Sequence, residues 1–303
     1  MILTIGIPVY NGEKYIEETI TKILMADFDW QNVEVLVSDN NSTDGSCTVV
    51  EKYSKVKLYK HASNVGYDGN INRIFNYAQG RYVWTIGADD ILTTSDVAEI
   101  NKIVASDTTY SVIYVGEPLP GKTGVMAIAE DFLYASDFRS GFVSNNIINK
   151  QLWLNSEASE FIGSGWIHYG MVLKVLKQAP SYIMSKMYVT EIEETKHNKS
   201  WIKGGQGLLV GLNLVEIFDR MEIWGYSTQM KRRCKLVIKG SYPKIIIFSK
   251  CIGLQINLGI LKRFIRLYSE FASFWLIDMP ILVTPGFLFT ALFSFYKKLK
   301  PDA

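Results

Sequence analysis

The chain has 303 residues, of which 48% are hydrophobic and 20% are charged, so it is long enough for a catalytic domain with a large core. This composition excludes a disordered tail and a low-complexity linker protein. The formal net charge is only +2, but two parts of the chain differ in sign. Residues 231–303 carry thirteen Lys and Arg against three Asp and Glu, a net charge of +10, whereas residues 1–230 carry a net charge of −8. A basic, apolar tail on an acidic body indicates that one end meets an anionic surface.

The cysteines and the N-terminus indicate the compartment. The three cysteines, Cys47, Cys234 and Cys251, form no CxxC pair, which argues against a disulfide framework and against a cysteine zinc site. Residues 1–9 are apolar but too short for a secretory signal, and they lack a basic leader. We therefore expect a reducing cytoplasm.

The first hundred residues alternate between apolar runs and stretches of helical period. Strands are predicted at residues 2–9, 33–37, 56–59 and 82–86. Helices are predicted between them, at residues 13–25, 46–53 and 71–78. Units of this length predict an α/β fold with a parallel, doubly wound sheet. The later chain is expected to contribute a strand at 111–115, a loop at 117–124 and the rest of the sheet from 131–189.

Polar clusters follow each of the predicted strands. They are Tyr10-Asn11, Asp39-Asn40-Asn41, Asn64-Val65-Gly66 and Asp89-Asp90. Ligands of doubly wound sheets bind outside the carboxyl ends of the strands. Four clusters at one edge therefore predict a single binding site.

Two of these clusters carry carboxylates suited to a nucleotide. Asp89 and Asp90 on a strand-end turn could hold a divalent cation that bridges phosphates. Adjacent acids are also common at helix starts, and Ser95-Asp96 could cap the next helix. Asp39 could accept hydrogen bonds from a base or ribose, or simply form an Asx turn.

The order and spacing of four motifs carry a resemblance to a known family. They are Ile7-Pro8-Val9-Tyr10-Asn11, residues 38–45 (Ser-Asp-Asn-Asn-Ser-Thr-Asp-Gly), Asn64-Val65-Gly66 with Asn72, and Gly80-Arg81-Tyr82 before Ala88-Asp89-Asp90. Together they resemble the GT-A nucleotide-binding domain of family 2 glycosyltransferases, strongly over residues 1 to about 100 and loosely over 140–205. Asp68, Asn70 and a Gly-Ala-Asp-Asp at 87–90 are similar to the abequosyltransferase-like branch.

The resemblance implies a domain plan. Residues 1–230 would form the GT-A domain, with a nucleotide-sugar-binding half at 1–105 and an acceptor-binding half at 106–230. Residues 231–303 would form a helical, basic, membrane-associated extension.

The resemblance also implies an inverting transfer of a sugar from a nucleotide donor to a hydroxyl group, with Mn²⁺ or Mg²⁺ as cofactor. Asp89 would be the metal ligand and Asp90 would support it, while Gly87 replaces the first acid of the family motif. Asp39 would bind the base. The remaining nucleotide-sugar-binding residues would be Pro8, Tyr10, Asn11, Asn41, Asn64, Gly66 and Asn72.

An inverting transfer needs a base for the acceptor hydroxyl. Most relatives supply an Asp from a Glu-Asp pair, but the corresponding residues 161–169 contain none. His168 is the predicted base, because the abequosyltransferase-like branch carries His there and an ordinary His pKa near 6.5 suits neutral pH. The alternative is that His168 is a helix-start residue bonded to the backbone or the acceptor, with Glu157 and Glu160 as other candidate bases.

A third histidine extends the predicted metal site. Residues 195–200 (Thr-Lys-His-Asn-Lys-Ser) resemble the family's Arg-x-His-x-x-Ser segment. His197 would complete the metal shell or touch the diphosphate, with help from Lys196 or Lys199, and this would stabilise charge on the leaving group. The alternative is an exposed polar loop.

The tail alternates basic residues with apolar runs, which is typical of amphipathic helices on an anionic bilayer. Residues 279–296 carry no charge and reach the length of a spanning helix. Pro280, Pro285 and Gly286 interrupt the run, so an in-plane or re-entrant anchor is favoured over a span. Alternatively, the helices pack on the main domain or a partner subunit. Nucleic-acid binding is disfavoured, since exposed aromatics do not accompany the charges.

The predicted protein is thus a family 2 glycosyltransferase on the cytoplasmic face of the bacterial inner membrane, peripheral or monotopic. Its partners would be a nucleoside-diphosphate-sugar donor and a polyprenyl-diphosphate-linked glycan acceptor in O-antigen or surface polysaccharide synthesis, with the oligomeric state open. The alternatives are a transferase acting on polyprenyl phosphate and a catalytically silent, nucleotide-binding GT-A module.

Overall fold

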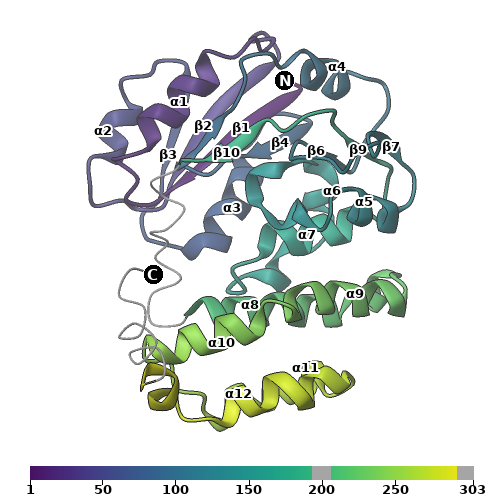
Figure 1. Cartoon of the computed structure of the whole chain (residues 1–303). Helices are drawn as coiled ribbons and strands as arrows, with labels where there is room; N and C mark the ends of the chain where they lie inside the picture. Colours follow the sequence, from purple (N-terminus) through teal and green to yellow (C-terminus); the bar gives the residue numbers. More distant parts are fainter. Residues whose placement is uncertain (193–205, 292–303) are drawn as a thin grey trace. The chain divides into compact units, whose positions relative to one another are not determined.

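The structure is a computed structural model that describes residues 1–192 and 206–291. It divides into two compact units, residues 1–196 and residues 197–303. The first unit contains both strands and helices, whereas the described part of the second is helical (Figure 1).

The first unit alternates strands and helices over its first hundred residues, as predicted. The elements in chain order are β1 (Leu3–Val9), α1 (Ile16–Leu24), β2 (Val33–Asp39), α2 (Ser46–Val50), β3 (Val56–Lys60), α3 (Gly66–Tyr77), β4 (Tyr82–Thr85), β5 (Asp90–Leu92) and α4 (Ala98–Val104). The later elements are β6 (Val112–Tyr114), β7 (Gly124–Met126), α5 (Ala129–Ala135), the 3-10 turns η1 (Arg139–Gly141) and η2 (Val143–Asn145), β8 (Asn146–Asn149), α6 (Lys150–Leu154), η3 (Ala158–Phe161), α7 (Ile167–Val175), β9 (Ser181–Ile183) and β10 (Val189–Glu191).

Eight strands form one sheet in the order β3-β2-β1-β4-β8-β6-β9-β7. The first four are parallel, and β8 pairs antiparallel with both β4 and β6. This confirms the predicted α/β fold with a mostly parallel sheet. The chain steps from β1 outward to β2 and β3 and then returns to β4 on the other side of β1. A ligand crevice is expected where the direction reverses, at the carboxyl ends of β1 and its neighbours.

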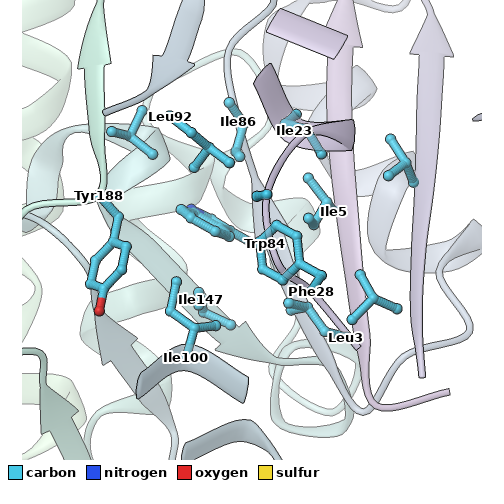
Figure 2. Close-up of a cluster of buried hydrophobic side chains, with 14 of the residues drawn as sticks. Leu3, Ile5, Ile23, Phe28, Trp84, Ile86, Leu92, Ile100, Ile147 and Tyr188 are labelled. Atoms are coloured by element: carbon cyan, nitrogen blue, oxygen red, sulfur yellow. The ribbon is translucent and has the colours of Figure 1, made fainter. Parts of the chain in front are cut away.

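The pleat of the strands sends alternate side chains to two cores. Leu3, Ile5, Ile7 and Val9 of β1 join Trp84 of β4 and side chains from α1, α2 and α4 on one face. Figure 2 shows Leu3, Ile5, Ile23 and Trp84 within this cluster. On the other face, Gly6 allows α3 to lie close, because a Cβ there would be 2.3 Å from Ile74 Cγ2. Helices thus cover both faces of the sheet, and the loops that follow the strands lie at the carboxyl edge.

One helix begins earlier than the sequence predicts. The hydrophobic pattern placed its start at residue 71, but α3 begins at Gly66. Asn64 explains the difference, since its Oδ1 accepts a hydrogen bond from Gly66 N at 2.8 Å and supports the first turn. Tyr67 and Asp68 consequently lie on the first turn of α3.

The second unit consists of helices around a core of its own. They are α8 (Gln206–Asp219), a 3-10 turn η6 (Met221–Trp224), α9 (Thr228–Lys239), α10 (Tyr242–Cys251), α11 (Leu258–Tyr268), a π-helical turn η7 (Phe274–Asp278) and α12 (Met279–Val283). Leu208 and Leu212 of α8 pack with Tyr242 of α10 and Phe264 of α11. The apolar face of α8 belongs to this core, so α8 lies in the second unit, whereas the expected domain boundary lies at residue 230.

The apolar stretch that begins at Met279 is interrupted in the structure. α12 ends at Val283, and Thr284 adopts an extended conformation before Pro285. Within residues 1–192 and 206–291, we find no helix that combines the length and apolar character needed to cross a bilayer.

Candidate active site

The loops after β1 and β2 are joined by reciprocal hydrogen bonds. Ser42 Oγ accepts from Asn11 N at 2.9 Å, and Asn11 Oδ1 accepts from Thr43 N at 2.8 Å. Ser46 Oγ likewise accepts from Gly12 N at 2.9 Å. Asn11 has φ 52°, a conformation that Asn tolerates better than most residues. These bonds join the two loops into one double loop, which carries residues predicted to bind the base and ribose of the nucleotide.

Asp39 lies at the end of β2 in the floor of this double loop. Only 2% of the residue is exposed, and its carboxylate accepts from Ser42 N at 3.2 and 3.3 Å. Burial and the neighbouring Asp39 carboxylate raise the pKa of the Cys47 thiol to about 11. The bonds from Ser42 N show that Asp39 forms the Asx turn, and the turn places its buried carboxylate at the edge of the sheet.

A third loop joins through Asn40, which the sequence analysis did not select as a site residue. Its Oδ1 accepts from Val65 N at 2.8 Å, and its Nδ2 donates to Asn64 Oδ1 at 2.9 Å. Asn40 thereby links the second loop to the Asn-Val-Gly turn. Asn41, beside it, is exposed at φ 66° and is free of this packing role.

The acidic pair follows β4 at the same edge. Asp90 is 3% exposed, and its Oδ2 accepts from Ser144 Oγ at 2.5 Å. Ser144 Oγ also accepts from Gly87 N at 3.0 Å, so one hydroxyl fixes the whole turn. Asp89 is half-buried, and among the described residues its carboxylate has no hydrogen-bond or ion-pair partner.

The structure explains why glycine replaces the first acid of the motif. A Cβ on Gly87 would lie 2.6 Å from Asp90 Oδ2 and 3.2 Å from Asp89 Oδ1. Both carboxylates therefore converge on the space that a side chain at position 87 would fill. Restoring an acid there would push the Asp90 carboxylate away from Ser144.

The acidic pair suits a divalent cation that is shared with a diphosphate. Mg²⁺ is usually bound through one or two carboxylates together with substrate phosphates. The Asp89 carboxylate, with Asp90 beside it, supplies that donor set. Among residues 1–192 and 206–291, no cluster of three or more His, Cys, Asp or Glu forms a closed metal cage.

The segment that leads to His197 begins at this pair. β10 runs antiparallel to β5 and pairs Glu191 with Asp90, and Ile192 N donates to Asp89 O at 3.0 Å. His197, Lys196 and Lys199 lie outside the described residues, so their roles stay predictions.

His168 lies in the first turn of α7 and is 5% exposed. Its Nε2 donates to Gly141 O at 2.9 Å, and its Nδ1 lies 3.3 Å from the Tyr67 hydroxyl. Burial lowers the pKa of His168 to about 4. The helix-start alternative thus describes its position correctly, and its role as base stays a prediction.

Asp68 explains how α7 is placed. Its carboxylate, 4% exposed, accepts from Gly165 N at 2.8 Å and from Ile167 N at 3.1 Å. These N–H groups belong to the turn that starts α7, where negative charge is favoured. The first turn of α3 therefore holds the first turn of α7.

The structure brings most of the predicted residues to one edge of the sheet. Pro8 is the last residue but one of β1, Tyr10 is 52% exposed, and Gly66 opens α3 at φ 75°. Asn72 differs, because its Oδ1 accepts from Trp153 Nε1 at 3.0 Å and so engages α6. Sequence reasoning missed Ser144 and Tyr67: Ser144 has no motif around it, whereas Tyr67 directly follows Asn-Val-Gly.

The fold and this edge define a class. The mostly parallel sheet, with the carboxylates of Asp39 and Asp89 at the ends of β2 and β4, defines an α/β domain of the kind that binds ligands at this edge. A family model, "Glycosyl transferase family 2", matches residues 4–156, just over half of the chain. The chain belongs to glycosyl transferase family 2.

Among the curated relatives, two examples each match about a third of the chain. Abequosyltransferase RfbV of Salmonella typhimurium is 32% identical over 103 residues, which cover 32% of this chain and 31% of the relative. The poly(ribitol-phosphate) beta-N-acetylglucosaminyltransferase TarS of Staphylococcus aureus is 32% identical over 96 residues, which cover 30% of this chain and 17% of the relative. The chain thus spans less than a third of the length of these curated relatives.

Solved structures show the same fold over most of the chain. S. aureus TarS 1-349 in complex with UDP-GlcNAc has a TM-score of 0.58 at 16% identity, covering 93% of this chain and 78% of the other. A mannosyltransferase from Pyrobaculum calidifontis in complex with GDP-Man and Mn²⁺ has a TM-score of 0.55 at 15% identity, covering 99% and 88%. At these identities the likeness establishes the GT-A fold alone.

Proposed function

We propose that the chain is an inverting glycosyltransferase that moves a sugar from a nucleoside diphosphate to a hydroxyl group of a glycan. The observation that carries this proposal is the half-buried Asp89 carboxylate, which has no partner among the described residues and lies at the same sheet edge as the recessed Asp39. Related folds hold UDP-GlcNAc in one case and GDP-Man with Mn²⁺ in another. Both ligands combine a base, which would face Asp39, with a diphosphate, which would face Asp89.

In this arrangement Asp39 accepts hydrogen bonds from the base, and the double loop around Asn11 encloses the ribose. Asp89, supported by Asp90, faces the diphosphate. A bound Mn²⁺ or Mg²⁺ supplies positive charge that stabilises the departing nucleoside diphosphate. Ser144 keeps Asp90 oriented, so that the acidic pair is preorganised before substrate binds.

Three side chains are candidates for the general base that takes the proton of the acceptor hydroxyl. To act as the base, His168 would need Nδ1 to contact the acceptor hydroxyl. In this structure the Tyr67 hydroxyl lies beside Nδ1 instead. Glu160 forms an ion pair with Lys174, and Glu157 is exposed in η3's N-terminal position.

A donor panel tests the proposal directly. We expect one nucleoside diphosphate sugar to yield free nucleoside diphosphate in the presence of Mn²⁺, because many transferases slowly pass the sugar to water. The measurement is coupled detection of the released nucleotide over uridine, guanosine, cytidine and thymidine donors. Nucleotide binding without release from any donor would instead favour the silent module.

We also propose that the second unit rests on an anionic membrane, which would bring the first unit to a lipid-linked glycan on the cytoplasmic face of the inner membrane. Leu276, Val283 and Phe287 are 78%, 58% and 70% exposed, at spacings of seven and four residues. α10, which packs against α12, exposes Phe248 and the basic Lys244 four residues apart. Exposed apolar side chains with neighbouring basic ones are typical of interfacial helices.

Vesicle flotation tests this membrane contact. The double variant Leu276→Ser/Phe287→Ser should bind vesicles of phosphatidylcholine and phosphatidylglycerol at least about tenfold more weakly, because each large side chain contributes ~1.5–3 kcal/mol when buried. Ile223→Ser is the matched control, since Ile223 is 77% exposed in the same unit but lies in η6. Equal flotation of the double variant and the control would contradict the proposed contact.

A further inference from the structure

Tyr67 and His168 form a contact pair, and their rings meet edge to face at 5.8 Å between centroids. The proton positions follow from the partners. Gly141 O can only accept, so His168 Nε2 carries a proton. Because burial keeps the ring neutral above a pKa of about 4, Nδ1 is then an acceptor, and the Tyr67 hydroxyl donates to it over 3.3 Å.

Asp68 and Gly141 hold this pair in place. Asp68, next to Tyr67, fixes the start of α7 through the N–H groups of Gly165 and Ile167. Gly141, which holds His168, lies three residues before Ser144, which holds Asp90. The short segment 139–146 therefore connects the Tyr67–His168 pair to the acidic pair.

The acidic pair also acts electrostatically on the Tyr67 hydroxyl. Partial burial, and after it the carboxylates of Asp68, Asp90 and Asp89, raise the pKa of the Tyr67 hydroxyl. The phenol therefore stays protonated, and its proton stays directed to His168. Nevertheless, 45% of Tyr67 is exposed, whereas His168 is 5% exposed. A ligand can therefore touch Tyr67 much more readily than His168.

We propose that Tyr67 is a substrate-binding residue whose hydroxyl oxygen accepts a hydrogen bond from a sugar hydroxyl group, and that His168 is the positioning residue that holds the Tyr67 proton. This inference rests on the proposed transferase function. With its proton committed to Nδ1, the Tyr67 oxygen presents only lone pairs to the site. It thus selects a hydroxyl donor and disfavours a second acceptor such as a phosphate oxygen.

The role differs from base catalysis, and substitutions at position 168 separate the two. Asn places a carbonyl oxygen near the position of Nδ1. This oxygen can accept a hydrogen bond from the Tyr67 hydroxyl, but it cannot take a proton from the acceptor as a base would. We expect Tyr67→Phe and His168→Ala each to lower kcat/KM about tenfold to hundredfold, and His168→Asn to recover activity to within about threefold of the wild type. The double variant Tyr67→Phe/His168→Ala should have a kcat/KM no lower than that of Tyr67→Phe alone, because both changes remove the same hydrogen bond between the two side chains.

The assay compares donor hydrolysis with transfer to an acceptor for the full chain. A loss in both reactions places the donor sugar on Tyr67, and a loss in transfer alone places the acceptor there; either result supports the inference. Tyr77→Phe on the same helix is the control and should keep wild-type kcat/KM, which separates the effect from a general change in α3.

Two results would overturn the inference while the proposed function stands. One is wild-type kcat/KM in Tyr67→Phe, and the other is His168→Asn as inactive as His168→Ala, which would make His168 the base. A wild-type chain that releases nucleotide from no donor would instead refute the proposed function, and the inference with it.

Discussion

We expect Asp89→Asn to lower sugar transfer on the order of 10³-fold while leaving the melting temperature unchanged. Metal-assisted charge stabilisation contributes several kcal/mol to a barrier, and each 1.36 kcal/mol is a factor of ten. Asn keeps the shape of Asp but removes the negative charge that faces the cation and diphosphate. Stability should not fall, because the Asp89 carboxylate has no partner within the described part of the chain.

The measurement is nucleotide release at saturating Mn²⁺, together with thermal unfolding of each variant. Asp107→Asn is the control, since Asp107 is an exposed acid outside the site, and it should behave as wild type. Asp90→Asn should differ from Asp89→Asn by lowering stability too, because it weakens the bond from Ser144. Near-normal turnover of Asp89→Asn would remove Asp89 from the site.

The second large effect is expected at Asp39. Asp39→Asn should weaken binding of the matching nucleoside diphosphate about tenfold to hundredfold, since hydrogen bonds to charged groups contribute ~1.5–3 kcal/mol. The amide would also turn an N–H group toward the base or toward Ser42 N, which now donates to the carboxylate.

Isothermal titration measures this affinity, and Cys47→Ala supplies the matched control. The Cys47 thiol contacts the Asp39 carboxylate, so its removal disturbs the same pocket but leaves the carboxylate in place. We expect Cys47→Ala to bind nucleotide within about threefold of wild type. Equal loss in the two variants would assign the effect to local packing and not to recognition of the base.

The parallel half of the fold could be predicted because its signals are local. Each strand of β1 to β4 is an apolar run followed by polar turn residues, and these turns carry the motifs. The edge of the sheet follows from the topology, which is why Asp39 and Asp89 could be assigned to one site. The start of α3 was missed because a side-chain bond from Asn64, rather than hydrophobic period, sets it.

The remaining features depend on contacts between distant segments. Ser144 reaches Asp90 across 54 residues of sequence, and the Tyr67 hydroxyl reaches His168 across 101. No pattern within either segment announces such a pair. The division of the chain also depends on such contacts: the charge changes sign at residue 230, whereas packing on α10 and α11 places α8 in the second unit.

We propose that the site at the carboxyl ends of β1, β2 and β4 transfers a sugar with inversion of its anomeric configuration. The most direct test is a reaction of the full chain with the donor found in the panel and a lipid-linked glycan acceptor, followed by NMR of the product. The account predicts a new glycosidic bond whose anomeric configuration is opposite to that of the donor. A product with retained configuration, or bound nucleotide with no glycoside formed, would contradict it.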